Sequence, residues 1–171
     1  MPAVLKLVDI RKTFNPGTVN EKRALNGLNL DLKEGDFVTV IGGNGAGKST
    51  MLNAIAGVWP VDEGEILIDG VNVTKLSEHK RAKYLGRVFQ DPQKGSASNL
   101  TILENMALAD NKNRHYSLLP AVNRSRIEYY RTLLQDCSMG LEDRLNVKTG
   151  SLSGGQRQAL ALVIANMSDI D

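Results

Sequence analysis

The chain has 171 residues, enough for one sizeable domain or for a domain with a small subdomain. Its net charge is +2 and charged residues make up 23%, so no concentrated basic character indicates a nucleic-acid partner. The single cysteine, Cys137, excludes an internal disulfide and fits a reducing compartment. No apolar run has the length of a membrane span and the first residues lack a secretion-signal pattern, so we expect any action at a membrane to need a partner.

Apolar runs predict several strands in the first half of the chain. Residues 4–10 are rich in apolar and β-branched side chains, and residues 25–32 alternate apolar with polar side chains. Residues 37–41 are nearly all apolar, as in a strand that is covered on both faces of a parallel sheet. Residues 65–73 flank an Asp-Gly pair and predict a hairpin, and residues 86–89 predict a further strand.

A glycine-rich loop (residues 42–50, the glycine loop) lies between an expected strand and an expected helix. Its residues are Gly42, Gly43, Asn44, Gly45, Ala46, Gly47, Lys48, Ser49 and Thr50. Strand, glycine loop and helix form the context of a phosphate-binding loop, in which backbone N–H groups surround an anion. Lys48 then supplies positive charge to the β- and γ-phosphates, and the Ser49 hydroxyl can bind Mg²⁺. The alternative is a glycine-rich turn that contains Lys-Ser by chance.

Helix signals follow the glycine loop. Residues 51–56 continue as a helix that we expect to end near Gly57. Ser77 can begin a short helix that runs through Lys83. Thr101 and Glu104 fit a capping box at the start of another helix.

Two more helices are expected in the second half of the chain. Residues 127–137 place apolar side chains on one helical face, and this placement favours a buried apolar role for Cys137 over a reactive thiol. Residues 110–125 carry several cationic side chains, which we interpret as a solvated loop. Residues 152–156 open the last helix. Its buried face is predicted to hold Leu160, Val163, Ile164 and Met167.

The chain carries a second motif besides the glycine loop. This motif is Leu-Ser-Gly-Gly-Gln-Arg-Gln (residues 152–158, the signature segment). In this order and at this spacing the two motifs resemble the ATP-binding subunits of ABC transporters, and the resemblance covers the chain from Val4 onward. It implies an α/β fold: a P-loop NTPase core with an antiparallel β subdomain and a helical signature subdomain. The implied parts are a core with β subdomain at 1–92, a helical subdomain at 93–155 and a return helix at 156–171.

The resemblance also assigns roles to single residues. Gln90 looks like the family's glutamine-loop residue, which reaches Mg²⁺ and the attacking water, so Lys48 and Gln90 are the implied catalytic residues and Ser49 and Gln90 the implied metal ligands. Phe14 looks like the aromatic residue that stacks on adenine; the alternative is an ordinary core phenylalanine.

The signature segment has two interpretations. In the family it covers the γ-phosphate held by the other subunit of a head-to-tail dimer, and the residues that would do so are Ser153, Gly154, Gly155 and Gln156. A serine and two glycines at a helix start can bind an anion with hydroxyl and backbone N–H groups. The alternative is a plain helix cap by Ser153, which needs no ligand.

The chain departs from the family pattern after the signature helix. The family continues with an apolar strand ending in Asp-Glu, the general base, and then a histidine that touches the γ-phosphate. Asp169 and Asp171 do not follow such a strand, and His79 and His115 precede the signature segment. We therefore expect a truncated copy with an incomplete core, poor stability and no hydrolysis on its own.

The implied function is energy coupling. The subunit would bind ATP and Mg²⁺, pair with a second ATP-binding subunit as a homo- or heterodimer, and drive transmembrane permease subunits from the cytoplasmic face of the membrane. A substrate-binding protein is a further partner that the resemblance allows. The sequences of residues 28–36 and 76–92 look most like those of ATP-binding subunits from bacterial import systems for amino acids. The alternatives are a soluble ABC-type ATPase outside transport and a nucleotide binder that does not hydrolyse.

Overall fold

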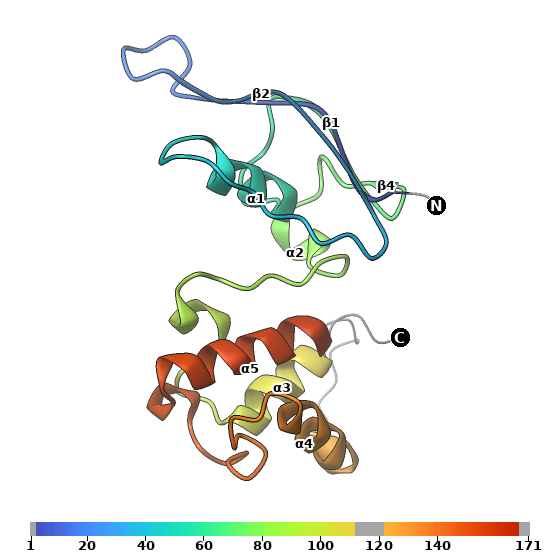
Figure 1. Ribbon diagram of the computed structural model, residues 1–171, viewed down its shortest axis with the longest axis vertical. Coiled ribbons are helices and arrows are strands. Elements are labelled where there is room, and N and C mark those ends of the chain that lie inside the picture. The colour runs from blue at the N-terminus through green and yellow to red at the C-terminus, as the bar shows by residue number, and fades with distance from the viewer. Residues whose placement is uncertain (1–2, 112–121, 168–171) are drawn as a thin grey trace. The chain divides into compact units, whose positions relative to one another are not determined.

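The computed structural model describes residues 3–111 and 122–167 (Figure 1). The chain divides into two compact units, Met1–Leu85 and Gly86–Asp171, and each is a separate body for the description of packing. The first unit combines a sheet with helices, and the second is helical in its described part. The finer division predicted from the sequence, 1–92, 93–155 and 156–171, stays a prediction.

The described part of the first unit contains a four-stranded antiparallel sheet with strand order β2-β1-β3-β4. The strands are β1 (Ala3–Phe14), β2 (Lys22–Lys33), β3 (Glu63–Ile68) and β4 (Val71–Asn72). Asp69 and Gly70 join β3 to β4 with φ of 49° and 75°, the positive values that a tight hairpin turn needs at both central positions. The strands predicted around residues 4–10, 25–32 and 65–73 are confirmed.

Helix α1 (Lys48–Ala56) packs against one face of this sheet (Figure 1). The shared buried cluster comprises Leu7, Ile10, Leu25, Met51, Ala54, Ile66, Ile68 and Val73. Gly57 ends α1 with φ of 83°, and its N–H donates to the carbonyl of Ala54 at 3.2 Å, so the predicted glycine stop is confirmed. Helix α2 (Glu78–Arg81) follows and is shorter than the helix expected over residues 77–83.

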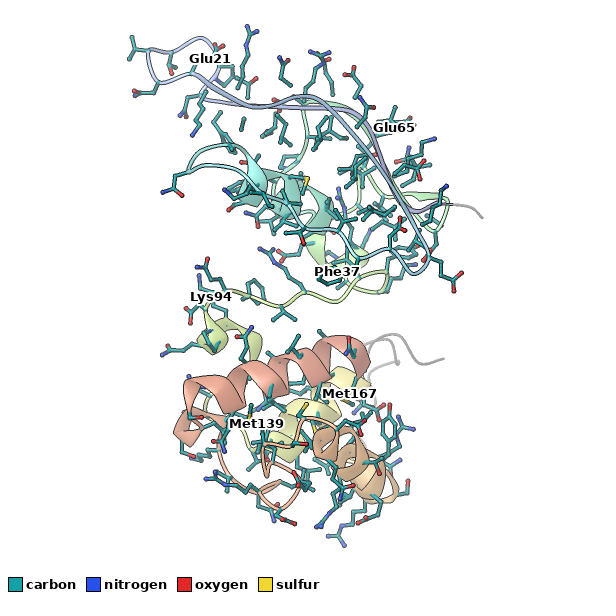
Figure 2. The ribbon with its side chains drawn as sticks, viewed as in Figure 1. Glu21, Phe37, Glu65, Lys94, Met139 and Met167 are labelled. Atoms are coloured by element: carbon teal, nitrogen blue, oxygen red, sulfur yellow. The ribbon has the colours of Figure 1, made fainter. Side chains whose placement is uncertain are left out.

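Two predicted strands do not form. Residues 37–41 are irregular, and the side chains of Phe37 and Ile41 are 95% and 90% exposed (Figure 2). Residues 86–89 are also irregular. A strand exists only where its backbone groups pair with a neighbour, and within residues 3–111 and 122–167 neither run has a pairing partner. The apolar composition of these runs predicted buried strands, but composition does not show whether a neighbouring strand is present to pair with them.

The second unit is built from short helices. They are η1 (Pro92–Gly95), α3 (Ile102–Asp110), η2 (Arg124–Arg126), α4 (Ile127–Gln135), η3 (Thr149–Ser151) and α5 (Gly154–Asn166). Thr101 accepts a hydrogen bond from the backbone of Glu104 at 3.2 Å and Glu104 bonds back to the Thr101 N–H at 2.7 Å, which confirms the predicted capping box.

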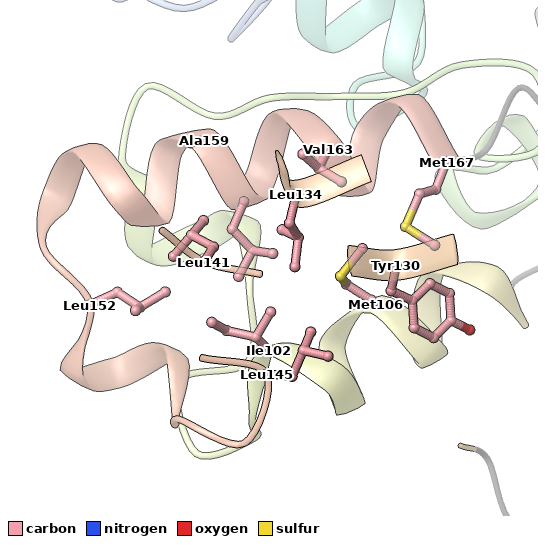
Figure 3. Close-up of a cluster of buried hydrophobic side chains, with 11 residues drawn as sticks. Ile102, Met106, Tyr130, Leu134, Leu141, Leu145, Leu152, Ala159, Val163 and Met167 are labelled. Atoms are coloured by element: carbon pink, nitrogen blue, oxygen red, sulfur yellow. The ribbon is translucent and has the colours of Figure 1, made fainter. Parts of the chain in front are cut away.

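One buried apolar cluster joins α3, α4 and α5 (Figure 3). Its members are Ile102, Met106, Tyr130, Leu134, Leu141, Leu145, Leu152, Ala159, Leu160, Val163 and Met167. Ile164 and Cys137 are partly buried and pack against this cluster, and burial raises the pKa of the Cys137 thiol. The apolar role predicted for Cys137 is confirmed. Most of the solvated loop predicted over residues 110–125 lies outside the described residues.

Across both described stretches, every helix falls short of the length and apolarity that crossing a membrane requires.

Candidate functional site

The glycine loop leads directly into α1. Gly45 and Gly47 have φ of 86° and 88°, in the left-handed region that other residues rarely adopt. Gly47 is the N-cap of α1, and no side chain accepts a hydrogen bond from the first turn as a cap. An anion placed at this end of α1 would therefore meet N–H groups and the positive end of the helix dipole.

The glycine loop also lies close to strand β2. A Cβ atom added to Gly47 would stand 2.5 Å from the carbonyl oxygen of Ala24, a distance that real side chains do not tolerate. A Cβ added to Gly42 would stand 3.2 Å from the Cβ of Ala46, on the other side of the loop. Glycine is therefore required at Gly47 for two independent reasons, its backbone angle and the close approach of β2.

Lys48 is the first residue of α1, and its side chain turns back over the glycine loop. The Nζ atom donates hydrogen bonds to the carbonyl oxygens of Gly42 at 2.5 Å and Gly43 at 2.8 Å. An ammonium group has three N–H donors, so one remains for an oxygen of a bound phosphate. The ammonium is thus already held at the mouth of the loop.

Ser49 and Thr50 follow Lys48 in the first turn of α1 and differ in exposure. Ser49 is exposed, whereas Thr50 is 8% exposed. Within residues 3–111 and 122–167, no cluster of three or more His, Cys, Asp or Glu side chains could hold a metal ion. Hydroxyl, amide and phosphate oxygens are hard ligands of the kind that Mg²⁺ prefers, so the exposed Ser49 hydroxyl is a suitable ligand for a Mg²⁺ ion that binds with a nucleotide.

Phe14 lies at the end of β1 and is half-buried. Its ring meets the ring of Trp59 edge to face, with the centroids 5.1 Å apart and an interplanar angle of 81°. The ammonium of Lys12 lies 5.7 Å from the centre of the Phe14 ring. An edge-to-face neighbour fixes the orientation of the Phe14 ring at the end of β1.

Asp62 ties the end of β1 to the segment that follows α1. Its carboxylate accepts hydrogen bonds from Lys12 Nζ at 2.8 Å and from the Thr13 N–H at 2.6 Å. The hydrogen bond from Lys12, with the one from Thr13, lowers the pKa of Asp62. The backbone immediately before Phe14 is therefore held by a charged side chain from residue 62.

The signature segment begins helix α5. Ser153 is the N-cap: its Oγ accepts a hydrogen bond from the Gln156 N–H at 3.3 Å, and Gln156 Oε1 accepts one from the Ser153 N–H at 3.3 Å. The cap function that the sequence offered as the alternative is thus realised. It does not exclude a ligand, because the Ser153 hydroxyl still has its own O–H donor.

Gly154 and Gly155 are exposed, and a Cβ atom added to either would meet nothing within 4 Å. Internal packing therefore does not explain these glycines, and their backbone is open to a close approach from outside. Arg157 holds the turn before them, because its Nη2 donates to the carbonyl oxygens of Gly150 at 3.0 Å and Leu152 at 3.3 Å.

Gln90 is exposed and lies in irregular chain just before η1. Asp91 caps η1 by accepting a hydrogen bond from the Gln93 N–H at 3.0 Å. The predicted site residues therefore fall in two groups. Phe14 and the glycine loop belong to the first unit, whereas Gln90 and the signature segment belong to the second.

Sequence reasoning missed three side chains of the first unit that bear on the site. Trp59 orients Phe14, Asp62 holds the end of β1, and Lys22 of β2 reaches the glycine loop. Each acts across a long sequence separation. No local pattern marks such a pairing, although the position of the single tryptophan just after α1 was a usable hint.

Comparison with known proteins identifies the family. The ABC transporter family model matches residues 25–171. The chain belongs to the ABC transporter family. The match covers the glycine loop and the signature segment, so the resemblance carried by these two motifs is confirmed.

Two similar proteins are ATP-binding proteins of transport systems. A tyrosine transport ATP-binding protein of Clostridioides difficile is 37% identical over 166 residues, which cover 96% of this chain and 65% of that protein. The methionine import ATP-binding protein MetN of Helicobacter pylori is 35% identical, over 98% of this chain and 48% of that protein. The chain thus spans about half to two thirds of the length of these relatives.

Solved structures confirm the predicted fold class, an α/β P-loop NTPase with antiparallel β and helical parts. The ATP-binding cassette MJ0796, in a dimeric post-hydrolysis state bound to ADP and Pi, has a TM-score of 0.78 and 33% identity over 96% of this chain and 70% of that chain. The cassette MJ1267 has a TM-score of 0.76 and 27% identity over 99% of this chain and 66% of that chain. The family is one of transport-coupled ATPases; the predicted inactivity of this segment on its own stays a prediction.

Proposed function

We propose that this chain is the ATP-binding, energy-coupling part of an ABC transporter subunit. It binds ATP and Mg²⁺ at the glycine loop, pairs head to tail with a second ATP-binding subunit, and drives transmembrane permease subunits by hydrolysis. One observation carries the proposal: the loop with left-handed Gly45 and Gly47 leads into α1, and the Lys48 ammonium is held over its carbonyls.

The residues of the glycine loop fit a nucleoside triphosphate. The free N–H of Lys48 and the first turn of α1 both favour phosphate oxygens. The exposed Ser49 hydroxyl gives one oxygen ligand for Mg²⁺, and the role of Gln90 as a further ligand stays a prediction from the family resemblance. Mg²⁺, when bound, would neutralise charge that develops on the phosphates.

Phe14 is the proposed platform for the base. Its ring is oriented by Trp59 and lies at the end of β1, which pairs with β2, and β2 approaches the glycine loop at Ala24. A base stacked on Phe14 and phosphates held by Lys48 would both be bound by the first unit. Stacking of this kind tolerates any base, because every base has a π-face.

The signature segment is proposed to complete the site of a second subunit. The open backbone at Gly154 and Gly155 and the free O–H of Ser153 support this role. With Gln156 they would contact the γ-phosphate held by the partner's glycine loop, so ATP would join the two subunits and hydrolysis would release them. The dimeric state of the MJ0796 cassette supports the pairing of two ATP-binding subunits.

The proposed partners are permease subunits at the cytoplasmic face of the cell membrane, with a substrate-binding protein if the system imports. The names of the two relatives, tyrosine transport and methionine import, support an amino-acid importer. Nucleic acid is not a proposed partner.

Titration calorimetry with ATP and Mg²⁺ tests the binding site. Lys48→Ala should abolish measurable binding, because it removes the ammonium held over the loop. The matched control is Lys33→Ala, which removes an exposed lysine of the same unit and should leave the affinity unchanged. Equal affinities of the wild-type chain and Lys48→Ala would refute the site.

A further inference from the structure

A second lysine reaches the glycine loop from strand β2. Lys22 is the first residue of β2, and a Cβ atom added to Gly45 would stand 3.3 Å from the Lys22 Nζ atom. Gly45 is a middle residue of the loop and has the left-handed φ of 86°. The Lys22 ammonium therefore lies beside the part of the loop where the backbone turns, at a position distinct from Lys48, which bonds to Gly42 and Gly43.

The ammonium of Lys22 is available for a ligand. Its side chain is exposed, and in residues 3–111 and 122–167 it takes part in no ion pair. The neighbouring Arg23 differs, because its Nε atom lies 3.6 Å from Oε1 of Glu21, the residue just before β2 (Glu21 is labelled in Figure 2). Two adjacent cations on one strand thus have different surroundings: Arg23 faces a carboxylate, and Lys22 faces the glycine loop.

Lys22 also lies opposite the proposed base platform. In the β1–β2 pairing the direct partner of Lys22 is Phe14. Side chains at directly paired positions of an antiparallel sheet are neighbours on the same face. A nucleotide with its base on Phe14 and its terminal phosphates at Lys48 would therefore extend its phosphate chain along the stretch that Lys22 reaches at Gly45.

We propose that Lys22 is a second phosphate-binding cation of the glycine loop, contributed by the β1–β2 hairpin. This inference rests on the proposed binding of ATP. Its chemistry is that of a mobile, hydrated point charge with three donors, which neutralises phosphate oxygens without demanding one fixed geometry. Lys22 is a binding residue in this proposal, and the role of Lys48 is unchanged.

The test compares ATP affinity by titration calorimetry in the wild-type chain, Lys22→Gln, Lys22→Arg and Arg23→Gln. Lys22→Gln should weaken ATP binding by about 5- to 20-fold, at and somewhat below the lower end of the range for a charge-assisted hydrogen bond, because water and ions screen an exposed site. Lys22→Arg keeps the charge and should stay within about threefold of the wild type. Arg23→Gln removes the same charge one residue away and should leave the affinity unchanged.

The dependence of ATP affinity on salt concentration provides a second measurement, and a merely structural role of Lys22 would not change that dependence. A phosphate contact at an exposed site is screened by ions, so the loss in Lys22→Gln should be large at low salt and small at high salt. Thermal melting of each variant, followed by circular dichroism, should match the wild type because Lys22 is exposed.

The outcomes separate this inference from the proposed function. If the wild type binds ATP, Lys48→Ala does not, and Lys22→Gln behaves like Arg23→Gln, then the role of Lys22 is wrong and the binding site stands. If Lys22→Gln weakens binding equally at low and high salt, the electrostatic role is overturned. If the wild type fails to bind ATP, the proposed function and this inference fall together.

Discussion

Arg81 donates a 2.6 Å hydrogen bond from Nη1 to the carbonyl oxygen of Ala54, in the last turn of the helix that Lys48 begins. The same guanidinium bonds to the carbonyls of Ile55 at 2.9 Å, Thr74 at 2.8 Å and Leu76 at 2.9 Å. Arg81 is only 1% exposed. A buried arginine thus satisfies the carbonyl end of α1 and links it to the chain after β4.

Replacement of Arg81 by methionine should destabilise the first unit. The change keeps much of the apolar bulk but leaves buried carbonyls without donors, so we expect the free energy of unfolding to fall by about 3 kcal/mol. Urea denaturation followed by circular dichroism measures it. Lys80→Met, on the same helix but exposed, is the control and should change stability by less than about 0.5 kcal/mol. Similar midpoints for both variants would contradict the role of Arg81.

The structure of the glycine loop predicts different effects of alanine substitution at two of its glycines. Gly47→Ala adds a Cβ atom 2.5 Å from the Ala24 carbonyl oxygen at a residue with φ of 88°, so it should lower the free energy of unfolding by about 1–3 kcal/mol and weaken ATP binding. Gly43→Ala meets nothing within 4 Å and should leave both quantities nearly unchanged. Denaturation and calorimetry measure the pair. Equal tolerance of alanine at both positions would show that the loop conformation differs from the one described.

The lowered pKa of Asp62 predicts a pH dependence of stability. A carboxylate whose pKa is lower in the folded chain stabilises the fold above its unfolded pKa of about 4, and this contribution is lost as the pH falls through the folded value. The Asp62 side chain is 42% exposed, so the contribution should stay below about 1 kcal/mol. Asp62→Asn should lower stability at neutral pH and remove this part of the acid dependence.

Denaturation midpoints at several pH values between neutral and acid check the Asp62 prediction. Asp31→Asn is the control, because Asp31 is exposed and makes no ion pair within the residues that the structure describes. If Asp62→Asn and Asp31→Asn have the same midpoint at neutral pH, the bonds from Lys12 and Thr13 do not stabilise the fold.

The signature segment can be tested through dimer formation. Ser153→Arg should spare ATP binding by the monomer and block the ATP-bound dimer, because a long cation would occupy the surface proposed for the partner's nucleotide. Ser153 also caps α5, and loss of a cap costs about 1 kcal/mol, so a second variant is needed. Gly155→Arg leaves the cap intact and adds bulk where a Cβ atom meets nothing.

Sedimentation of the subunit with ATP and Mg²⁺ measures this result. Gln135→Arg, which adds the same charge at the exposed end of α4, is the control and should dimerise as the wild type does. A dimer that persists in both Ser153→Arg and Gly155→Arg would exclude the proposed role between subunits.

Elements that depend on neighbouring residues were predictable from the sequence. The Asp69-Gly70 turn, the Gly57 helix stop and the capping box of Thr101 with Glu104 all formed where their residue types indicated. Each depends on backbone preferences or hydrogen bonds within a few residues. The left-handed glycines of the glycine loop and the start of α1 belong to the same class, whereas the close approach of the loop to Ala24 of β2 does not.

Elements that depend on distant residues were not predictable. Residues 37–41 have the composition of a buried strand, yet the run cannot supply the neighbouring strand that would pair with it. The contacts of Trp59 with Phe14 and of Lys22 with Gly45 join residues that only the β1–β2 hairpin and the segment after α1 bring together. No periodicity within either segment encodes them.

The two carbonyl bonds of Lys48 have a consequence for the energetics of ligand capture. A free lysine side chain samples many rotamers, and freezing it costs up to about 2 kcal/mol. In this chain that ordering has already occurred during folding, because the ammonium is anchored to Gly42 and Gly43. An arriving triphosphate would meet a preorganised cation and lose less entropy on binding, so the affinity of the loop is set in part before any nucleotide arrives.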